Sequence, residues 1–346
     1  MRRALILGGT GLIGQAAARR LLTAGWQVDV TGRDPAHLPA SLTAAGARFA
    51  AVDRADTAAM LAIAGDGIDL VVDCICYAAG DAAALLPLAC SANSTVMISS
   101  NAVYVDAVGR HVNSDAAPHF DGPVREDQPT MAPSADGNYQ SREGYGANKV
   151  AAEQILLDSG APVTVLRPGK VHGAWAARPR EWLFVKRALD RRPVVFLARY
   201  GAAVAQTTAA DNIAALIETV ADKPARRILN SADPDAPSAL EIARTIARLS
   251  GHHFDEVLLG PEADPALGRH PWDAKFPIVL DMTAALELGY VPAGDYARTV
   301  GAEVDWLIAA AAGDEGPRPL AWLGDDYFDA FFDYGAEDRY LAERAR

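Results

Sequence analysis

A glycine-rich turn at the N-terminus constrains the fold of this chain more than any other feature. Residues 4–7, Ala-Leu-Ile-Leu, form an unbroken apolar run, which is typical of a buried parallel strand. Gly8, Gly9, Gly11 and Gly14 follow at once, and apolar side chains then recur at helical spacing. Strand, glycine turn and helix together predict a dinucleotide site, whose pyrophosphate faces the N–H groups at the helix start.

Three glycines of this turn have separate physical roles. Gly8 lets the chain leave the strand tightly, Gly11 lets the backbone approach a pyrophosphate, and Gly14 lets the helix pack closely on the strand. The spacing Gly-x-x-Gly-x-x-Gly differs from the Gly-x-Gly-x-x-Gly of most dehydrogenases. An ordinary strand-to-helix turn is the alternative, and the position of the motif favours the dinucleotide site.

Strand patterns and helix patterns alternate over the first half of the chain. Further strands are predicted over residues 27–31, 48–53, 68–75, 95–98 and 163–167, with helices among them. This order predicts an α/β fold of the Rossmann type, with a doubly wound parallel sheet whose carboxyl-terminal strand ends meet at one edge. A ligand is expected at that edge.

The end of the second predicted strand bears on the choice of coenzyme. Enzymes of this kind that prefer NAD usually place Asp or Glu there, whereas this chain has Thr31 and then Arg33. An arginine pairs with a 2′-phosphate, so NADP(H) is the predicted cofactor, with NAD as the alternative. Asp34 is an alternative acidic residue for the ribose hydroxyls of NAD, but Asp34-Pro35 is also a helix-start signature.

Bulk properties narrow the class of partner. The chain has 346 residues and a net charge of −12, which disfavours general affinity for nucleic acid and for anionic membranes. No apolar run approaches the roughly 20 residues of a membrane helix, and the apolar run after Arg2 and Arg3 is too short for a signal peptide. The expected partner is a small molecule, with a homodimer as an open alternative.

Cysteine and histidine usage predicts neither a disulfide framework nor a metal site. Cys74, Cys76 and Cys90 are odd in number, so we expect a protein of the reducing cytoplasm. Cys74 and Cys76 alternate within a predicted strand, which points both side chains to one face as buried core residues. The pair at 252–253, His-His, has no second ligand cluster nearby and is expected to be solvated.

Four motifs follow one another in the order, and near the spacing, of a known family. They are residues 8–14 (GGTGLIG), 99–104 (SSNAVY), 145–149 (YGANK) and 167–169 (RPG). On these motifs the chain resembles the extended short-chain dehydrogenase/reductases, often labelled NAD-dependent epimerase/dehydratases. The resemblance is continuous to about residue 167 and looser to about residue 310.

The resemblance implies roles for particular residues. Ser100 is the hydroxyl donor to the reacting oxygen, with Ser99 as the alternative, while Tyr145 is the general acid/base and Lys149 binds the nicotinamide ribose. The residues expected to bind the coenzyme in the glycine turn are Gly8, Thr10, Gly11, Leu12, Ile13 and Gly14. Arg33 follows just beyond the second strand, Asp53 and Arg54 are expected at the adenine, and Ala78 lies at a small-residue turn. Tyr145 and Lys149 complete the set.

Residue chemistry agrees with the roles of Tyr145 and Lys149. The two residues are four apart and therefore share a helix face. A free tyrosine has a pKa of about 10 and is a poor base at neutral pH, but a nearby ammonium and an oxidised nicotinamide favour the phenolate. A helix-start aromatic residue and a solvated lysine are the alternatives.

The residues expected to contact substrate are Ser100, Asn101, Lys170, His172 and Trp175. For the last two, a structural histidine and a packing tryptophan are the alternatives. Family members that act on nucleotide sugars typically have Asn where this chain has Lys170, and an Arg in a segment where residues 201–211 contain none. A diphosphate needs cations or N–H groups, which Lys170, Arg178 and Arg180 supply in part, so that substrate class stays open.

The resemblance also implies a division of the chain into three parts. Residues 1–168 form an NAD(P)-binding Rossmann domain, residues 169–312 a smaller substrate-binding lobe interleaved with it, and residues 313–346 a C-terminal extension. Residues 105–144 form a long irregular segment that either covers a substrate or is a disordered insertion. The lobe is expected to contain helices at 181–189, from 211 onward and at 238–249, and strands at 194–196, 202–204 and 227–230.

Aromatic and acidic side chains are interspersed in the C-terminal extension. So many aromatic residues must be buried, either on the chain's own lobe, as a lid, or in a dimer contact. They are Trp322, Tyr327, Phe328, Phe331, Phe332, Tyr334 and Tyr340, with Asp325, Asp326, Asp329 and Asp333 among them.

Together these features predict an NADP(H)-dependent oxidoreductase that acts at a carbonyl or carbinol centre. A nucleotide-sugar epimerase or dehydratase that uses bound NAD(P) is the alternative, although Asn101-Ala102 stand where the dehydratases usually carry an acidic pair. A second alternative is a non-catalytic cofactor-binding regulator or an RNA-associated protein. Intact Ser100, Tyr145 and Lys149 argue for catalysis, and the acidic charge argues against RNA.

Overall fold

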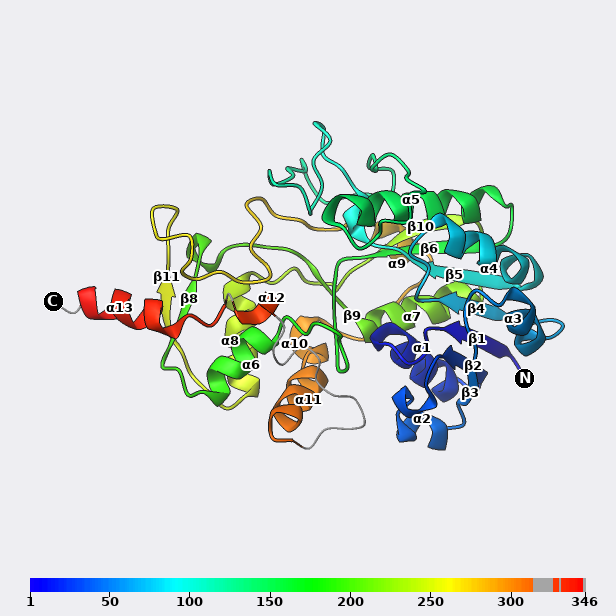
Figure 1. Cartoon of the computed structure of the whole chain (residues 1–346), viewed down its shortest axis with the longest axis horizontal. Coiled ribbons are helices and arrows are strands. Elements are labelled where there is room, and N and C mark those ends of the chain that lie inside the picture. Colours follow the sequence, from blue (N-terminus) through cyan, green and yellow to red (C-terminus); the bar gives the residue numbers. More distant parts are fainter. Residues whose placement is uncertain (314–325, 330, 345–346) are drawn as a thin grey trace.

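A seven-stranded sheet forms the centre of the computed structural model, which describes residues 1–313, 326–329 and 331–344 (Figure 1). Its strands are β1 (Arg3–Leu7), β2 (Gln27–Gly32), β3 (Arg48–Ala51), β4 (Leu70–Asp73), β5 (Ser94–Ile98), β6 (Val163–Pro168) and β10 (Arg227–Ser231). They lie in the order β10-β6-β5-β4-β1-β2-β3, and every neighbouring pair is parallel. This topology confirms the predicted α/β fold of the Rossmann type.

Helices cover both faces of the sheet because successive strand residues point to opposite sides. Ile6 packs into the core under one set of helices, and its neighbour Leu5 packs into the core under the other set. The first set is α1 (Leu12–Thr23), α2 (Ala40–Ala44) and α7 (Ala210–Ala221), and the second is α3 (Thr57–Ala64), α4 (Ala79–Ser91) and α5 (Arg142–Asp158). The sheet is therefore doubly wound, as predicted.

The third and fourth strands end earlier than the sequence predicts. β4 ends at Asp73 because the Asp73 carboxylate accepts the N–H of Ile75 at 2.8 Å and bends the chain. Cys74 and Cys76 therefore lie beyond the strand, and they pack into the cores on opposite faces of the sheet. The prediction that both cysteines point to one face is wrong for this reason.

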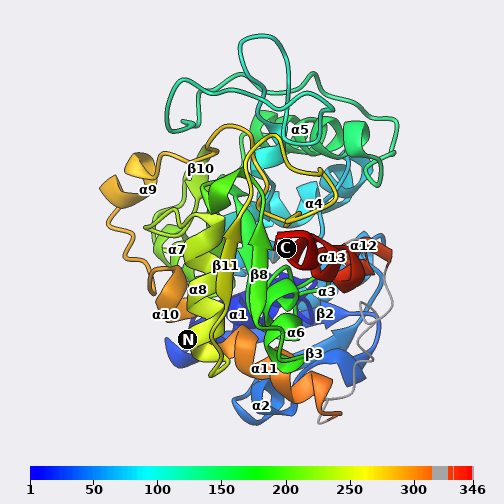
Figure 2. The same cartoon turned by 90° about the vertical axis from the view of Figure 1, so that its left-hand side faces the viewer.

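The lobe lies beyond β6 and exchanges elements with the sheet. Strand β7 (Lys170–His172) pairs with β9 (Thr207–Ala209), after which α7 and β10 return to the Rossmann domain. Figure 2 shows β8 (Val194–Leu197) beside β11 (Asp255–Leu258) in the lobe. The other elements of this half are α6 (Trp182–Leu189), η3 (Arg199–Gly201), α8 (Ala239–Leu249), α9 (Thr283–Glu287), α10 (Tyr296–Thr299) and α11 (Gly301–Ala311).

The predicted strand at 202–204 does not form. The chain there approaches residue 278 only through an isolated bridge from Ala205, and regular pairing with β7 begins at Thr207. The other two strands predicted for the lobe half, 194–196 and 227–230, correspond to β8 and β10. The domain boundaries at 168 and 312 stay a prediction.

The described part of the C-terminal extension packs on the chain's own lobe. Phe328, in α12 (Asp326–Asp329), is 3% exposed and lies in the core that Trp182 and Trp272 share. Glu337, in α13 (Tyr334–Arg344), forms a buried ion pair with Arg187 at 2.6 Å. Trp322 and Asp325 lie outside the described residues. In the part of the chain that the structure describes, no helix has the length and apolarity that crossing a membrane requires.

The irregular segment 105–144 is held by its own hydrogen bonds. Asp106 accepts the N–H groups of Arg110 at 2.9 Å and His119 at 3.0 Å. Burial alone would raise the pKa of Asp106, but these N–H groups lower it well below its usual range. Helix α5 begins at Arg142, within the last residues of this segment, and Ser141 caps it.

Candidate functional site

A cleft of about 580 Å³ lies at the carboxyl-terminal edge of the central sheet. Leu12 and Ile13, at the start of α1, line it together with Ser100, Tyr145 and Lys149. The parallel topology explains this meeting, because the segments that follow β1, β4 and β5 emerge at the same edge. The structure thus brings the glycine turn and the predicted catalytic residues to one cleft.

The glycine turn has the geometry that the sequence predicts. Gly8 has a φ of +76°, and its carbonyl accepts the N–H of Gly11 at 3.0 Å. A Cβ on Gly14 would stand 2.4 Å from the Gly8 oxygen, so a larger residue there would push α1 away from β1. Gly11 caps α1 without a side chain that could bond the first-turn N–H groups, and a pyrophosphate fits that place.

Lys149 lies almost fully buried beneath the cleft, with 2% of its surface exposed. Its ammonium donates to the backbone carbonyls of Cys76 at 2.7 Å and Ile98 at 2.9 Å. It also lies 4.4 Å from the centroid of the Tyr77 ring. Since an ammonium has three N–H donors, one remains for a ligand in the cleft.

Tyr77 is a second tyrosine of the cleft, and no sequence motif indicated it. Its ring stacks on that of Tyr139 with 5.2 Å between the centroids. Burial, and then the neighbouring Tyr145, raise the pKa of Tyr77 to about 12. The Tyr77 hydroxyl therefore keeps its proton at neutral pH.

The two serines after β5 have different surroundings. Ser99 is buried and donates to the Glu153 carboxylate, which also pairs with Arg167 at 2.5 Å. Ser100 is half-buried in the cleft, and its oxygen accepts the N–H of Ala102 at 3.1 Å, at the start of η2 (Asn101–Val103). No described residue accepts the hydroxyl proton of Ser100, so this hydroxyl can donate into the cleft.

The segment after β2 contains the residues that are candidates to bind the adenosine end of a coenzyme. Arg33 is exposed, and its guanidinium makes no hydrogen bond or ion pair within residues 1–313, 326–329 and 331–344. Asp34 instead accepts the N–H of Ala36 at 2.9 Å and caps η1 (Pro35–His37). Thr31 is buried, and its carbonyl accepts the N–H of Gly9 at 3.2 Å.

Arg54 is bonded to protein groups, and its predicted contact with the adenine stays a prediction. Its guanidinium donates to the Asp73 carboxylate at 2.9 Å and to the Asp81 carbonyl at 3.0 Å. Burial raises the pKa of Asp73, although the Arg54 charge opposes this. Asp53 is exposed and Ala78 is half-buried before α4, and their roles stay predictions.

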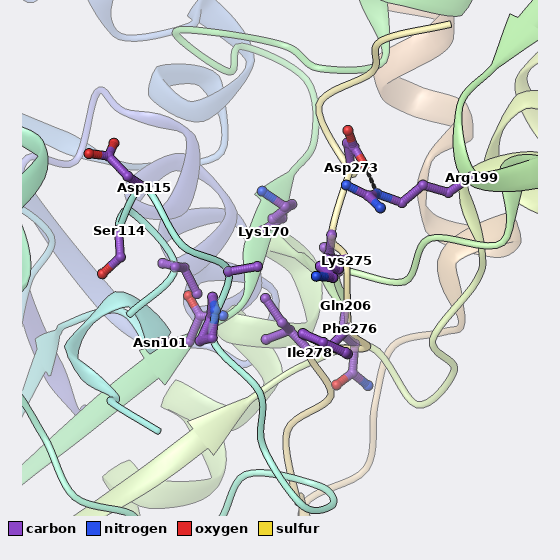
Figure 3. A pocket seen from close by; sticks show the side chains of 15 residues that line it. Asn101, Ser114, Asp115, Lys170, Arg199, Gln206, Asp273, Lys275, Phe276 and Ile278 are labelled. Atoms are coloured by element: carbon purple, nitrogen blue, oxygen red, sulfur yellow. Dashed lines mark hydrogen bonds and ion pairs between the residues drawn. The ribbon is translucent and has the colours of Figure 1, made fainter. Parts of the chain in front are cut away.

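Asn101 and Lys170 connect the cleft to a second cavity of about 250 Å³, and both residues line both spaces. Figure 3 shows Lys170 between Ser114 and Asp115 on one side and Arg199 on the other. Burial and the charge of Arg180 lower the pKa of Lys170 to about 7. The amine is thus poised between its charged and neutral forms near pH 7.

Two loops also line these spaces. Val112 and Asn113 reach the cleft from the segment 105–144, which favours the covering role over the disordered insertion. On the other side, Arg199 pairs with Asp273, and Phe276 lies nearby in the second cavity (Figure 3). No local motif marks these residues, because the fold alone brings them together.

His172 and Trp175 do not line the cleft, and their predicted contact with substrate stays a prediction. His172 is 1% exposed, and its Nε2 lies 2.9 Å from the Asp233 carboxylate. Burial alone would lower the pKa of His172, but the hydrogen bond to Asp233 raises it. The backbone turns at Gly173 (φ +140°) and Trp175 (φ +75°), and the Trp175 ring packs 5.5 Å from that of Trp306.

The topology, the glycine turn and the cleft at the sheet edge define a dinucleotide-binding protein of the Rossmann class. The model of the NAD dependent epimerase/dehydratase family matches residues 4–231 of the chain. The chain belongs to this family of enzymes, which confirms the resemblance seen in the four motifs. None of the curated proteins matches the chain by sequence.

Solved structures share the fold at low sequence identity. A Burkholderia cenocepacia protein thought to be an epimerase has 23% identity and a TM-score of 0.66, over 89% of this chain and 98% of its own. The UDP-glucuronic acid 4-epimerase of Bacillus cereus, solved with UDP-glucuronic acid and NAD, has 17% identity and a TM-score of 0.64 (89% and 99%). The Thermus thermophilus UDP-glucose 4-epimerase, solved with NAD, has 18% identity and a TM-score of 0.64 (89% and 99%).

Proposed function

We propose that this chain is an NADP(H)-dependent oxidoreductase that transfers a hydride at a carbonyl or carbinol centre. One observation carries the proposal: the uncapped start of α1 and the side chains of Ser100, Tyr145 and Lys149 line the same cleft. The start of α1 would hold the pyrophosphate of a coenzyme, and the three side chains would lie in the same cleft as its nicotinamide end. Lys170 and Asn101 then receive the substrate from the far side.

The residues of the turn fit a dinucleotide, and their surroundings favour NADP(H) over NAD(H). Gly14 leaves no room for a side chain, so backbone N–H groups stay accessible at the start of α1. Arg33 has no described partner, and a 2′-phosphate would provide one. Asp34, the acidic competitor, already caps η1 and is poorly placed to bind ribose hydroxyls.

Each of the three polar residues has a definable part in the reaction. When bound, the nicotinamide coenzyme supplies or accepts the hydride. Tyr145 gives its phenolic proton to the carbonyl oxygen during reduction and takes it back during oxidation. Ser100 donates its hydroxyl proton as a hydrogen bond to the same oxygen while negative charge develops there. Lys149 holds the ribose with its remaining N–H donor, because the other two bond Cys76 and Ile98.

Nucleotide-sugar epimerisation is the second candidate, because specific cations line the cleft. Lys170, Arg178 and Arg180 lie along its far wall, where they can neutralise a diphosphate. Epimerases among the structural neighbours bind UDP-sugars and NAD. In that reaction the coenzyme is regenerated in each turnover, so the two candidates differ in net coenzyme consumption.

A substrate panel tests the proposal. Purified enzyme is given NADPH or NADH with ketones, aldehydes and UDP-ketosugars, or NADP+ with the matching alcohols, and absorbance of the reduced nicotinamide is followed. Net oxidation or reduction of coenzyme supports the oxidoreductase. Interconversion of UDP-sugars without net coenzyme change supports the epimerase. Coenzyme binding without turnover on any substrate contradicts both and favours a regulatory protein.

A further inference from the structure

Behind the glycine turn, three ionisable side chains from separate parts of the chain converge. His172 ends β7, Glu181 precedes α6, and Glu303 lies in the first turn of α11. Their exposed fractions are 1%, 2% and 0%. One potential ligand atom of each lies within 4.8 Å of the others. None of the three lines the candidate active-site cleft, so the cluster is separate from the proposed chemistry.

The cluster contains acceptor atoms that lack donors. When His172 is neutral and donates its Nε2–H to the Asp233 carboxylate, Nδ1 is left as a lone-pair acceptor. His172 Nδ1 has no hydrogen-bond partner among the described residues, and it lies 4.0 Å from Oε2 of Glu303. Oε1 of Glu303 also has no such partner. Buried polar atoms are nearly always bonded, so two unbonded atoms within one cluster indicate a missing ligand.

Few protein N–H and O–H donors reach the carboxylates of the cluster, although Glu181 and Glu303 also form a side-chain hydrogen bond with each other. The N–H of Gly173 bonds one oxygen of Glu303 at 2.5 Å, and the hydroxyl of Tyr296 bonds one oxygen of Glu181 at 3.3 Å. Asp233, in contrast, accepts hydrogen bonds from several donors. Besides the histidine, Asp233 accepts bonds from Thr207 at 2.6 Å, Ala209 at 2.6 Å and Asn212 at 2.8 Å.

We propose that His172, Glu181 and Glu303 bind a divalent metal ion of the zinc type. An imidazole nitrogen and two carboxylate oxygens are a common ligand set for Zn²⁺, with a water molecule or a second carboxylate oxygen completing the sphere. A double positive charge compensates the two carboxylates. Asp233 plays the part of the outer carboxylate that fixes the tautomer and orientation of a metal-binding histidine.

The required movement is small. Ligand atoms around tetrahedral zinc are about 3.3 Å apart, given bonds of about 2.0–2.1 Å. The present separations of up to 4.8 Å therefore need a contraction of about 1.5 Å, shared among three side chains. A cavity of about 110 Å³, lined by His172 and by Gln15 and Arg19 of α1, gives an ion a route to the cluster.

The site would join the lobe to the dinucleotide-binding half. Its ligands come from β7, α6 and α11, and Gly173 lies against Leu12 at the start of α1, where an added Cβ would stand 2.9 Å from a Leu12 methyl carbon. A bound ion would hold these elements together behind the turn. This is a structural role, because the ion would have no contact with the cleft.

Metal titration of the full chain, purified without a metal-affinity tag, tests the proposal. The apoprotein is prepared with EDTA, and Zn²⁺ binding is measured by calorimetry and by elemental analysis after gel filtration. Co²⁺, whose visible absorption reports coordination by nitrogen and oxygen, serves as the spectroscopic probe. At a Zn²⁺ concentration 100 times Kd, we expect one ion per chain and a rise in Tm of about 4 °C that EDTA reverses.

Three variants locate the ion. Glu303→Gln and His172→Gln should each lose at least about tenfold in Zn²⁺ affinity and the Co²⁺ absorption band. His111→Gln is the matched control, because His111 is also buried and its Nε2 also bonds a carboxylate, that of Glu143 at 2.9 Å. The Nδ1 of His111, however, already accepts the N–H of Asn113. The control variant should keep both signals.

Several results would overturn the metal site. Wild-type protein that binds no stoichiometric Zn²⁺ or Co²⁺ overturns it without any variant, and shows that shared protons satisfy the cluster. Equal affinity in Glu303→Gln and wild type places the ion elsewhere. If His172→Gln fails to fold, Glu303→Gln and the wild-type titration still decide the question.

Discussion

Replacing Lys170 with methionine should stabilise the protein at low pH and lose that advantage as the pH rises. Burial, and then the charge of Arg180, lower the pKa of Lys170 from 10.5 to about 7 in the folded chain. Between these two values the unfolded chain binds more protons than the folded chain, so wild-type stability rises with pH. Lys170→Met removes this dependence while keeping most of the side-chain volume.

The size of the effect follows from the pKa. From pH 6 to pH 9 the folded group loses its proton, and two pH units above a pKa of 7 correspond to about 2.7 kcal/mol at 1.36 kcal/mol per unit. Because Lys170 is only half-buried and lines a cleft, we halve this limit for solvent screening. The stability gain of the variant should therefore shrink by about 1.4 kcal/mol between pH 6 and pH 9.

Urea denaturation of the apoprotein at pH 6, 7, 8 and 9 measures this change. Lys275→Met is the control, since Lys275 lines the same second cavity but is exposed, and the stability change of this variant is subtracted at each pH. A gain for Lys170→Met that is the same at pH 6 and pH 9 would refute the argument. The cleft would then hold Lys170 in a water-like environment.

Three further substitutions test other parts of the structure. Arg33→Ala should weaken NADPH binding by about tenfold and leave NADH binding unchanged in fluorescence titrations, because only NADPH offers a 2′-phosphate; equal losses would contradict the NADP(H) assignment. Gly14→Ala places a Cβ 2.4 Å from the Gly8 oxygen, so we expect a loss of about 2 kcal/mol in denaturation and weaker coenzyme binding, and an unchanged Tm would disprove the close packing. Glu337→Gln leaves Arg187 buried without its charge partner and should cost about 3 kcal/mol, whereas a cost near zero would mean that α13 is not held on the lobe.

Sequence patterns predicted those parts of the site that depend only on residues close together in the chain. The turn after β1 requires glycine at Gly8 and Gly14, so the residue types themselves indicate the backbone path. Tyr145 and Lys149 are one helical turn apart, which makes their shared face visible in the sequence. Parallel topology then brings both features to one edge, and the order of strands and helices was enough to predict this.

Other parts depend on contacts between distant segments, which sequence spacing does not reveal. Arg54 was expected to contact the adenine, and its bond to Asp73 at the end of β4 could not be predicted from sequence spacing. His172 was expected in the pocket, yet Gly173 turns the chain and leaves the imidazole beside Glu303, far along the sequence. For the same reason no metal site was predicted, because the three proposed ligands share no motif.

The end of the fourth strand was missed because a single side chain determines it. Asp73 stops β4 through a bond to the N–H of Ile75, although the apolar run continues to residue 75. That bond also changes which core each of Cys74 and Cys76 enters. Hydrophobic patterns indicate where a strand can form, but a polar side chain that bonds the next turn decides where it ends.

Hydride transfer in Tyr145→Phe, compared with wild type, tests the central claim most directly. Both proteins are saturated with NADPH and mixed with the best carbonyl substrate from the panel, and the single-turnover loss of nicotinamide absorbance gives the rate. Because Tyr145 lines the cleft as the proposed proton donor, we predict a rate at least about 100-fold lower in the variant, with a Kd for NADPH within about twofold of wild type. An unchanged rate in Tyr145→Phe would contradict the account.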